Sequence, residues 1–149
     1  MMRPKRLSLK RLIHGNEIGM HMTCQQLWGF KKVVTFDNYN KTNSVECIAK
    51  VLIPPGTKVI RPKKNVFNNS ASEQLRANKM IITGFYDIQT GDRLRLFNAN
   101  SIYNAHFEYR IGHFKMPDKF DENISKKCTH GLHFYLNLDQ AKKYREEYN

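Results

Sequence analysis

Residues 128–144, with the sequence CTHGLHFYLNLDQAKKY, join an expected strand to an expected helix and constrain the fold more than any other stretch. From Leu132 to Leu136 apolar residues occupy alternate positions, which is the period of a strand with one buried face. Asn137 stands where a helix N-cap is expected, and Asp139 follows in the first turn, where the helix dipole favours negative charge. Apolar residues then recur at helical spacing: Leu138, Ala141, Tyr144 and Tyr148. The segment predicts a buried strand followed by a C-terminal helix.

Other segments rich in β-branched and aromatic residues predict further strands. They are residues 31–36, 45–53, 80–86, 93–97 and 107–111. A Pro-Pro-Gly sequence ends the second of them, and the turn-forming sequence QTGD joins the third to the fourth as an expected hairpin. The sequence therefore predicts an α+β fold, a single domain with a mixed or antiparallel β-sheet and a C-terminal helix packed on it.

The N-terminal segment is strongly basic and lacks acidic residues as far as residue 12. We interpret residues 1–12 as a basic arm and residues 13–149 as the single α+β domain. Such an arm is typical of an electrostatic tether for phosphates, although a solvated tail without a ligand has the same composition. The arm's basic residues are Arg3, Lys5, Arg6, Lys10 and Arg11.

Charge and cysteine content narrow the functional class. The chain of 149 residues holds 25 Lys or Arg against 13 Asp or Glu, a net charge of +12, which favours association with polyanions or anionic surfaces. Its three cysteines are far apart and odd in number, which argues against a disulfide framework and for a reducing compartment. No apolar run is long enough for a membrane span or a signal peptide. We expect an intracellular protein.

A second group of basic residues lies on predicted strands and loops beside aromatic residues. These residues are Lys31, Lys32, Lys58, Arg61, Lys63 and Lys64, with Phe30, Phe36, Tyr39 and Phe67 nearby in the sequence. Positive charge interleaved with aromatic rings is the mixture that single-stranded nucleic acid binds through phosphate contacts and base stacking. Aromatic residues in strands are more often part of the core, so this interpretation requires that Tyr39 and Phe67 be exposed.

Metal and catalytic sites are not predicted. Cys128, His130 and His133 form the densest cluster of potential ligands, but on an extended strand His133 would face away from the other two. Glu108, His113 and His133 could act as acid or base groups, yet no nucleophile elbow, phosphate-binding loop or pair of catalytic carboxylates accompanies them. We therefore expect no metal, no cofactor and no catalytic residue.

Five segments together resemble a domain of unknown function that is encoded by giant and other large DNA viruses and by some bacteria, often attached to pentapeptide repeats. They are GFKKV at 29–33, AKVLIPPGTKV at 49–59, LRANKMIITGFYD at 75–87, YRIGHFKMPDKFDEN at 109–123 and the segment 128–144. The resemblance covers most of the chain, although this sequence contains no pentapeptide repeat. It implies a shared fold and a viral setting, with the protein in the cytoplasm or nucleus of the host cell or in the virion. It supplies no catalytic residue.

The sequence GLHFYLNLDQAKKY is also similar to the glycine, aromatic strand and alanine-bearing helix that line the nicotinamide pocket of ADP-ribosyltransferase-like folds. Those folds continue with further strands and usually a glutamate, whereas Glu146 and Glu147 here fall inside the predicted terminal helix. The main hypothesis is a non-enzymatic viral protein that binds nucleic acid or an acidic protein surface through its basic arm and loops. The alternatives are an ADP-ribosyltransferase-like or other nucleotide-handling enzyme, and a virion or assembly component. A concave pocket with convergent polar groups would favour the enzyme, and a convex basic face would favour the binding protein.

Overall fold

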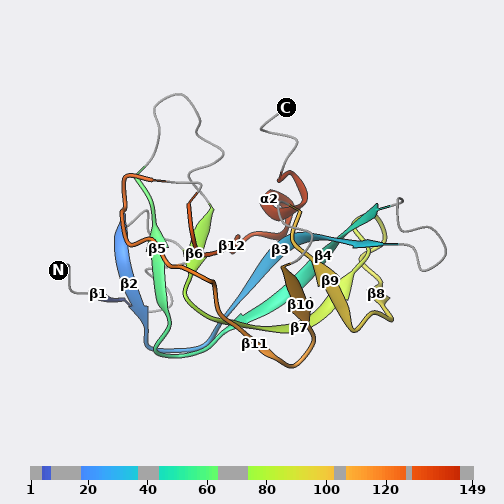
Figure 1. Ribbon diagram of the computed structural model, residues 1–149, viewed down its shortest axis with the longest axis horizontal. Coiled ribbons are helices and arrows are strands. Elements are labelled where there is room, and N and C mark those ends of the chain that lie inside the picture. Colours follow the sequence, from blue (N-terminus) through green and yellow to red (C-terminus); the bar gives the residue numbers. More distant parts are fainter. Residues whose placement is uncertain are drawn as a thin grey trace.

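A computed structural model describes residues 5–7, 18–36, 44–63, 74–102, 107–126 and 129–144. These residues form two β-sheets and one short helix (Figure 1). None of the helices among them is long and apolar enough to cross a membrane.

The smaller sheet has five strands in the order β1-β2-β5-β6-β12 and lies on the left of Figure 1. Its strands are β1 (Lys5–Leu7), β2 (Gly19–Thr23), β5 (Lys58–Arg61), β6 (Leu75–Ala77) and β12 (Leu132–Phe134). β1 pairs with β2 in parallel, and the other neighbours are antiparallel. Part of the predicted arm is therefore the edge strand of this sheet.

The larger sheet has seven strands, with the order β10-β9-β3-β4-β7-β11 and with β8 paired to β7. Its strands are β3 (Leu27–Phe36), β4 (Ser44–Ile53), β7 (Met80–Tyr86), β8 (Arg93–Leu94), β9 (Asn98–Asn100), β10 (Glu108–Arg110) and β11 (Phe114–Lys115). β3 and β4 pair along their whole length, and β7 pairs with β8 as the predicted hairpin. All strand pairs in this sheet are antiparallel.

The two sheets are joined where β12 reaches β3. Phe30 and Tyr135 exchange two backbone hydrogen bonds, each with an N···O distance of 2.8 Å. At the same place Phe134 packs directly over Gly29, since a Cβ atom on residue 29 would lie only 2.6 Å from the Phe134 ring. Glycine is thus required at position 29 because any side chain would collide with a core aromatic ring.

The main core lies between the sheets and contains residues from both, including Val33, Val51, Leu75, Phe85 and Phe134. Leu132 and Phe134 are fully buried, as the alternating pattern predicts, whereas Leu136 is only half-buried. Tyr135 is also buried, although it lies on the opposite face of the strand. The reason is a second, smaller cluster beneath the helix, in which Tyr135 packs with Ile48, Ala141 and Tyr144.

The predicted α+β class is wrong, because the described chain is mainly β. The one described helix, α2 (Leu138–Lys142), has five residues and contacts β3. Its N-cap is as predicted, with the Asn137 side chain accepting hydrogen bonds from the backbone of Asp139 and Gln140. The regular helix ends at Lys142, and just beyond it the Tyr144 carbonyl accepts a hydrogen bond from Lys32 Nζ at 3.0 Å. Residues 145–149 lie outside the described residues.

Candidate ligand-binding cavity

A cavity of about 650 Å³ opens where β3, β10 and β12 meet two connecting loops. This volume is within the range of about 300 to 1,000 Å³ that is typical of small-molecule sites. The residues that line it come from six separate parts of the chain: Lys31, Gln74, Ser101, Phe107, Tyr109, Pro117, Asp118, Lys119, Thr129, His130, Gly131, His133 and Tyr144. The lining combines basic, acidic, hydroxyl, amide and aromatic groups.

Lys31 is a central basic residue of the cavity. Its Nζ atom donates a hydrogen bond to the His133 carbonyl at 2.8 Å and lies 5.5 Å from the centroid of the Tyr109 ring. Burial of the amine lowers the pKa of Lys31 from 10.5 to about 8, because the charged form loses its hydration. At neutral pH the amine is therefore still mostly protonated, and the cavity contains a partly desolvated cation.

The aromatic part of the wall is formed by Phe107 and Tyr109. Their rings meet edge to face with a centroid distance of 5.3 Å, and Lys115 Nζ lies 3.9 Å from the Phe107 ring centroid. Burial raises the pKa of Tyr109, so its phenol stays protonated at all physiological pH values. Tyr109 is buried in the main core, so the partly exposed Phe107 ring is the part of this wall that a ligand can stack on, beside cations that would attract an anion.

One side of the cavity is carried by the loop between β11 and β12, and buried Arg76 fastens this loop. The guanidinium donates to the carbonyls of Asp121 at 2.9 Å, Asn123 at 2.7 Å and Lys126 at 2.7 Å. The Arg76 side chain also passes so close to Gly131 that a Cβ atom there would lie 3.0 Å from it. Arg76 thus fixes the backbone on which Asp118, Lys119 and Thr129 are presented to the cavity.

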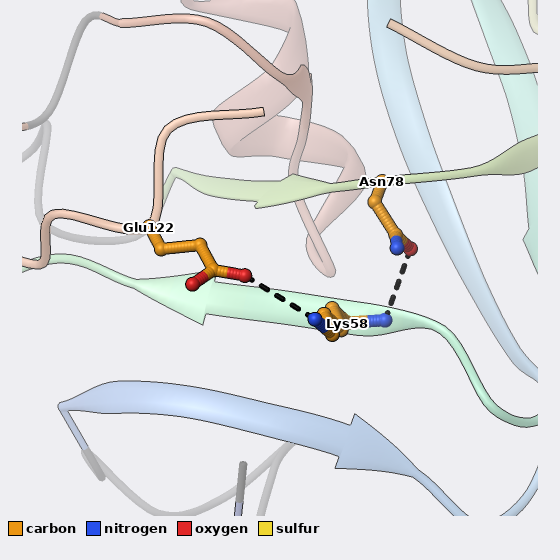
Figure 2. A network of polar contacts seen from close by, with 3 residues as sticks. All are labelled: Lys58, Asn78 and Glu122. Carbon is orange, nitrogen blue, oxygen red and sulfur yellow. Dashed lines mark hydrogen bonds and ion pairs between the residues drawn. The ribbon is translucent and has the colours of Figure 1, made fainter. Parts of the chain in front are cut away.

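Two further contacts hold the same loop. Thr129 Oγ1 donates to Asp121 Oδ2 at 2.7 Å, and this hydrogen bond is the main reason that the pKa of Asp121 is lowered. Figure 2 shows the second contact, in which Lys58 Nζ lies 3.2 Å from Glu122 Oε1 while the Lys58 backbone donates to Asn78 Oδ1 at 3.0 Å. Lys58 therefore connects β5 to the loop.

The basic residues predicted as a binding surface occupy several different environments. Lys31 lines the cavity and Lys63 is exposed, but Lys32 and Arg61 are buried in the fold. Lys32 Nζ pairs with Glu46 at 3.1 Å as well as with the Tyr144 carbonyl. Lys5 and Arg6 belong to β1, while the remaining predicted residues lie outside the described part: Arg3, Lys10, Arg11 and Lys64. Tyr39 and Phe67, whose exposure the nucleic-acid interpretation requires, also lie outside the described residues.

The predicted acid, base and metal-ligand candidates are dispersed. His130 and His133 both line the cavity, Glu108 and His113 lie on a separate surface hollow, and Cys128 is outside the described residues. In the described ranges, no three His, Cys, Asp or Glu side chains gather closely enough to hold a metal ion. Cys47 is buried, and burial raises the pKa of its thiol to about 12.

Sequence reasoning did not associate several cavity residues with a site. Phe107 and Tyr109 were predicted as strand residues, and Gln74, Asp118 and Thr129 carried no recognisable motif. Besides the predicted basic residue Lys31, a usable signal is the sequence Gly131 to His133, which is similar to part of the nicotinamide pocket in ADP-ribosyltransferase-like folds. It lies on the cavity wall.

The comparisons with known proteins give a family but no function. The search of curated proteins and the search of solved structures each found no match. A family model matches residues 18–141, which include all strands of both sheets except β1 and nearly all of α2. The protein therefore belongs to DUF5758, a family of unknown function.

Proposed function

We propose that the protein is a non-enzymatic binding protein for an acidic partner, and that this partner is nucleic acid. The observation that carries the proposal is the cavity, in which the Lys31 amine lies beside the aromatic residues Phe107 and Tyr109. A nucleotide unit offers a phosphate to such an amine and a base to the partly exposed ring of Phe107. An acidic protein surface would supply the negative charge without the stacking group, so the aromatic wall favours nucleic acid.

The charge of the whole chain supports the same proposal. The excess of basic over acidic residues produces a field that attracts polyanions before any specific contact forms. Close to the cavity, Lys119 and Lys126 are exposed on the loop that Arg76 holds. Lys63 lies beside this loop, because its backbone donates to the Ile124 carbonyl at 2.8 Å. A strand that places one base in the cavity would meet these lysines with its neighbouring phosphates.

We also propose the viral setting that the sequence resemblance implies, with the protein inside the host cell or in the virion. Both locations agree with a basic protein that meets nucleic acid.

The test is a titration of labelled single- and double-stranded DNA and RNA with the full chain at several salt concentrations. Log affinity should fall linearly with log salt, with each phosphate contact on a single strand contributing about 0.7 to the slope. Replacing the basic arm residues by glutamine should flatten that slope for all nucleic-acid sequences alike. The residues to replace are Arg3, Lys5, Arg6, Lys10 and Arg11. Substitution is preferable to deletion because residues 5–7 form β1. Failure to bind any nucleic acid at low salt would reject the proposal and would leave an acidic protein surface as the candidate partner.

A nucleotide-handling enzyme is a second candidate because of one specific observation. Gly131, His133 and Tyr144 line the cavity, and they belong to the segment that is similar to the nicotinamide pocket of ADP-ribosyltransferase-like folds. The test is incubation with NAD and separation of the products by chromatography. Release of nicotinamide that His133→Ala abolishes would favour this candidate. Unchanged NAD after prolonged incubation would reject an NAD-consuming activity and favour the binding protein.

A further inference from the structure

Two neighbouring lysines of β3 have opposite environments. The Lys32 amine is neutralised by Glu46, with an N···O distance of 3.1 Å. The Lys31 amine lines the cavity, and its described contacts are a backbone carbonyl and an aromatic ring, neither of which carries a negative charge. Among the residues that the structure describes, no ion pair joins the Lys31 amine to a carboxylate, and such an amine on a cavity wall is suited to amine chemistry.

We propose that Lys31 is a nucleophilic amine that captures, as an imine, an aldehyde carrying an aromatic ring and an acidic group. The aldehyde class follows from the amine, the ring from the Phe107 and Tyr109 wall, and the acidic group from the basic residues Lys119 and His130 on the same lining. This inference does not rest on the nucleic-acid proposal, because it concerns the reactivity of a single amine with a small molecule.

The reaction begins with the neutral amine. Its nitrogen lone pair attacks the carbonyl carbon, the carbonyl oxygen takes up a proton, and the nitrogen loses one, giving a carbinolamine. Loss of this hydroxyl group as water and of the remaining amine proton leaves a C=N bond between the ligand and Lys31. No oxidant or reductant is needed. The His133 carbonyl, 2.8 Å from Nζ, accepts one N–H of the amine and so fixes its position while the lone pair stays available.

The burial of Lys31 also favours the reactive form. With a pKa of about 8, about half of the Lys31 amine groups are neutral at pH 8. For an ordinary lysine the neutral fraction at that pH is below about 1 %. The resulting advantage is roughly a hundredfold in the fraction of reactive amine. The lower basicity of the nitrogen reduces this advantage, because a less basic amine is a weaker nucleophile. We therefore expect labelling of Lys31 to exceed that of any exposed lysine by about tenfold.

The experiment uses pyridoxal 5′-phosphate, an aromatic aldehyde with a phosphate group, at a ratio of one per full-length protein at pH 8. Cyanoborohydride reduces the imine to a stable amine, and mass spectrometry of peptides locates it. The expected result is one adduct per chain, on Lys31. Lys31→Arg should lose this adduct, while the control Lys143→Arg, which alters an exposed lysine, should keep it. Adducts spread over exposed lysines, with none preferred, would overturn the proposal.

Two further readouts protect the test against a variant that does not fold. Peptide mapping of the wild-type protein decides the position of the adduct without any substitution. The labelling rate of Lys31 should rise with pH and level off above pH 8, whereas a continued rise to pH 10 would show an ordinary lysine and overturn the proposal. The other charged or titratable groups on the lining are Tyr109, Asp118, Lys119, His130, His133 and Tyr144. Failure of this labelling leaves the salt-dependent titration of nucleic acid unaffected.

Discussion

Arg76 shows how much structure a single buried side chain can determine. It lies fully buried in β6, and its guanidinium donates to three carbonyls of the loop between β11 and β12. Desolvation lowers the pKa of Arg76, but arginine stays protonated at any pH at which the protein is folded. The planar fork of five donors suits this task, since three acceptors approach it from one loop.

Replacing Arg76 by lysine should therefore destabilise the protein although the charge is kept. One ammonium group cannot reach all three carbonyls, and each hydrogen bond from a charged donor contributes about 1.5 to 3 kcal/mol. We expect the free energy of unfolding in urea to fall by about 2 to 4 kcal/mol. The matched control is Arg95→Lys at an exposed position, where the change should stay within about 0.5 kcal/mol. Equal effects of the two substitutions would contradict the role assigned to Arg76.

The lowered pKa of Lys31 makes stability depend on pH in a predictable direction. Between pH 8 and pH 10.5 the folded protein has lost the Lys31 proton while the unfolded chain still holds it, so stability rises with pH. Relative to Lys31→Met, the wild type should gain about 1 to 2 kcal/mol of unfolding free energy from pH 7.5 to pH 10. Comparing the two proteins removes the contributions of Cys47 and Tyr109, whose raised pKa values they share. A difference that stays constant over this range would contradict the assignment.

At the scale of elements, the strands were easier to predict than the helix. The segments 45–53 and 80–86, rich in β-branched and aromatic residues, correspond to β4 and β7, and the alternating pattern at 132–136 corresponds to β12. The QTGD turn correctly indicated the β7–β8 hairpin. These signals are local, because neighbouring residues alone set the period of a strand. The chain just after α2 is held instead by Lys32, which is more than a hundred residues away and donates a hydrogen bond to the Tyr144 carbonyl. No local pattern carries that information.

The N-cap of α2 offers a test at this scale. Asn137 Oδ1 accepts from the backbone N–H groups of Asp139 at 2.8 Å and Gln140 at 3.3 Å. Asn137→Ala removes both bonds and should lower the free energy of unfolding by about 1 kcal/mol, measured in urea. Asn137→Asp keeps an accepting oxygen and should leave stability nearly unchanged. If both variants lose the same amount, the cap does not stabilise the helix.

At the scale of the whole molecule, the cavity could not be predicted from the sequence. Lys31, Gln74, Tyr109 and His133 are brought together only by the pairing of distant strands, and sequence spacing gives no sign of it. Composition predicts attraction to polyanions, since net charge needs no knowledge of the fold. It could not separate lysines that line the cavity from those that are buried, such as Lys32. Burial of a basic side chain depends on which strands pack over it.

The central claim is that the cavity, and not charge in general, binds the acidic partner. The most direct measurement is the affinity for a labelled single-stranded oligonucleotide, by fluorescence anisotropy at one salt concentration. It compares Lys31→Met with Arg95→Met, two substitutions that each remove one positive charge, the first in the cavity and the second on the exposed segment after β8. The account predicts that Lys31→Met weakens binding about tenfold or more and Arg95→Met about twofold at most. Equal losses, or binding unchanged by Lys31→Met, would contradict it.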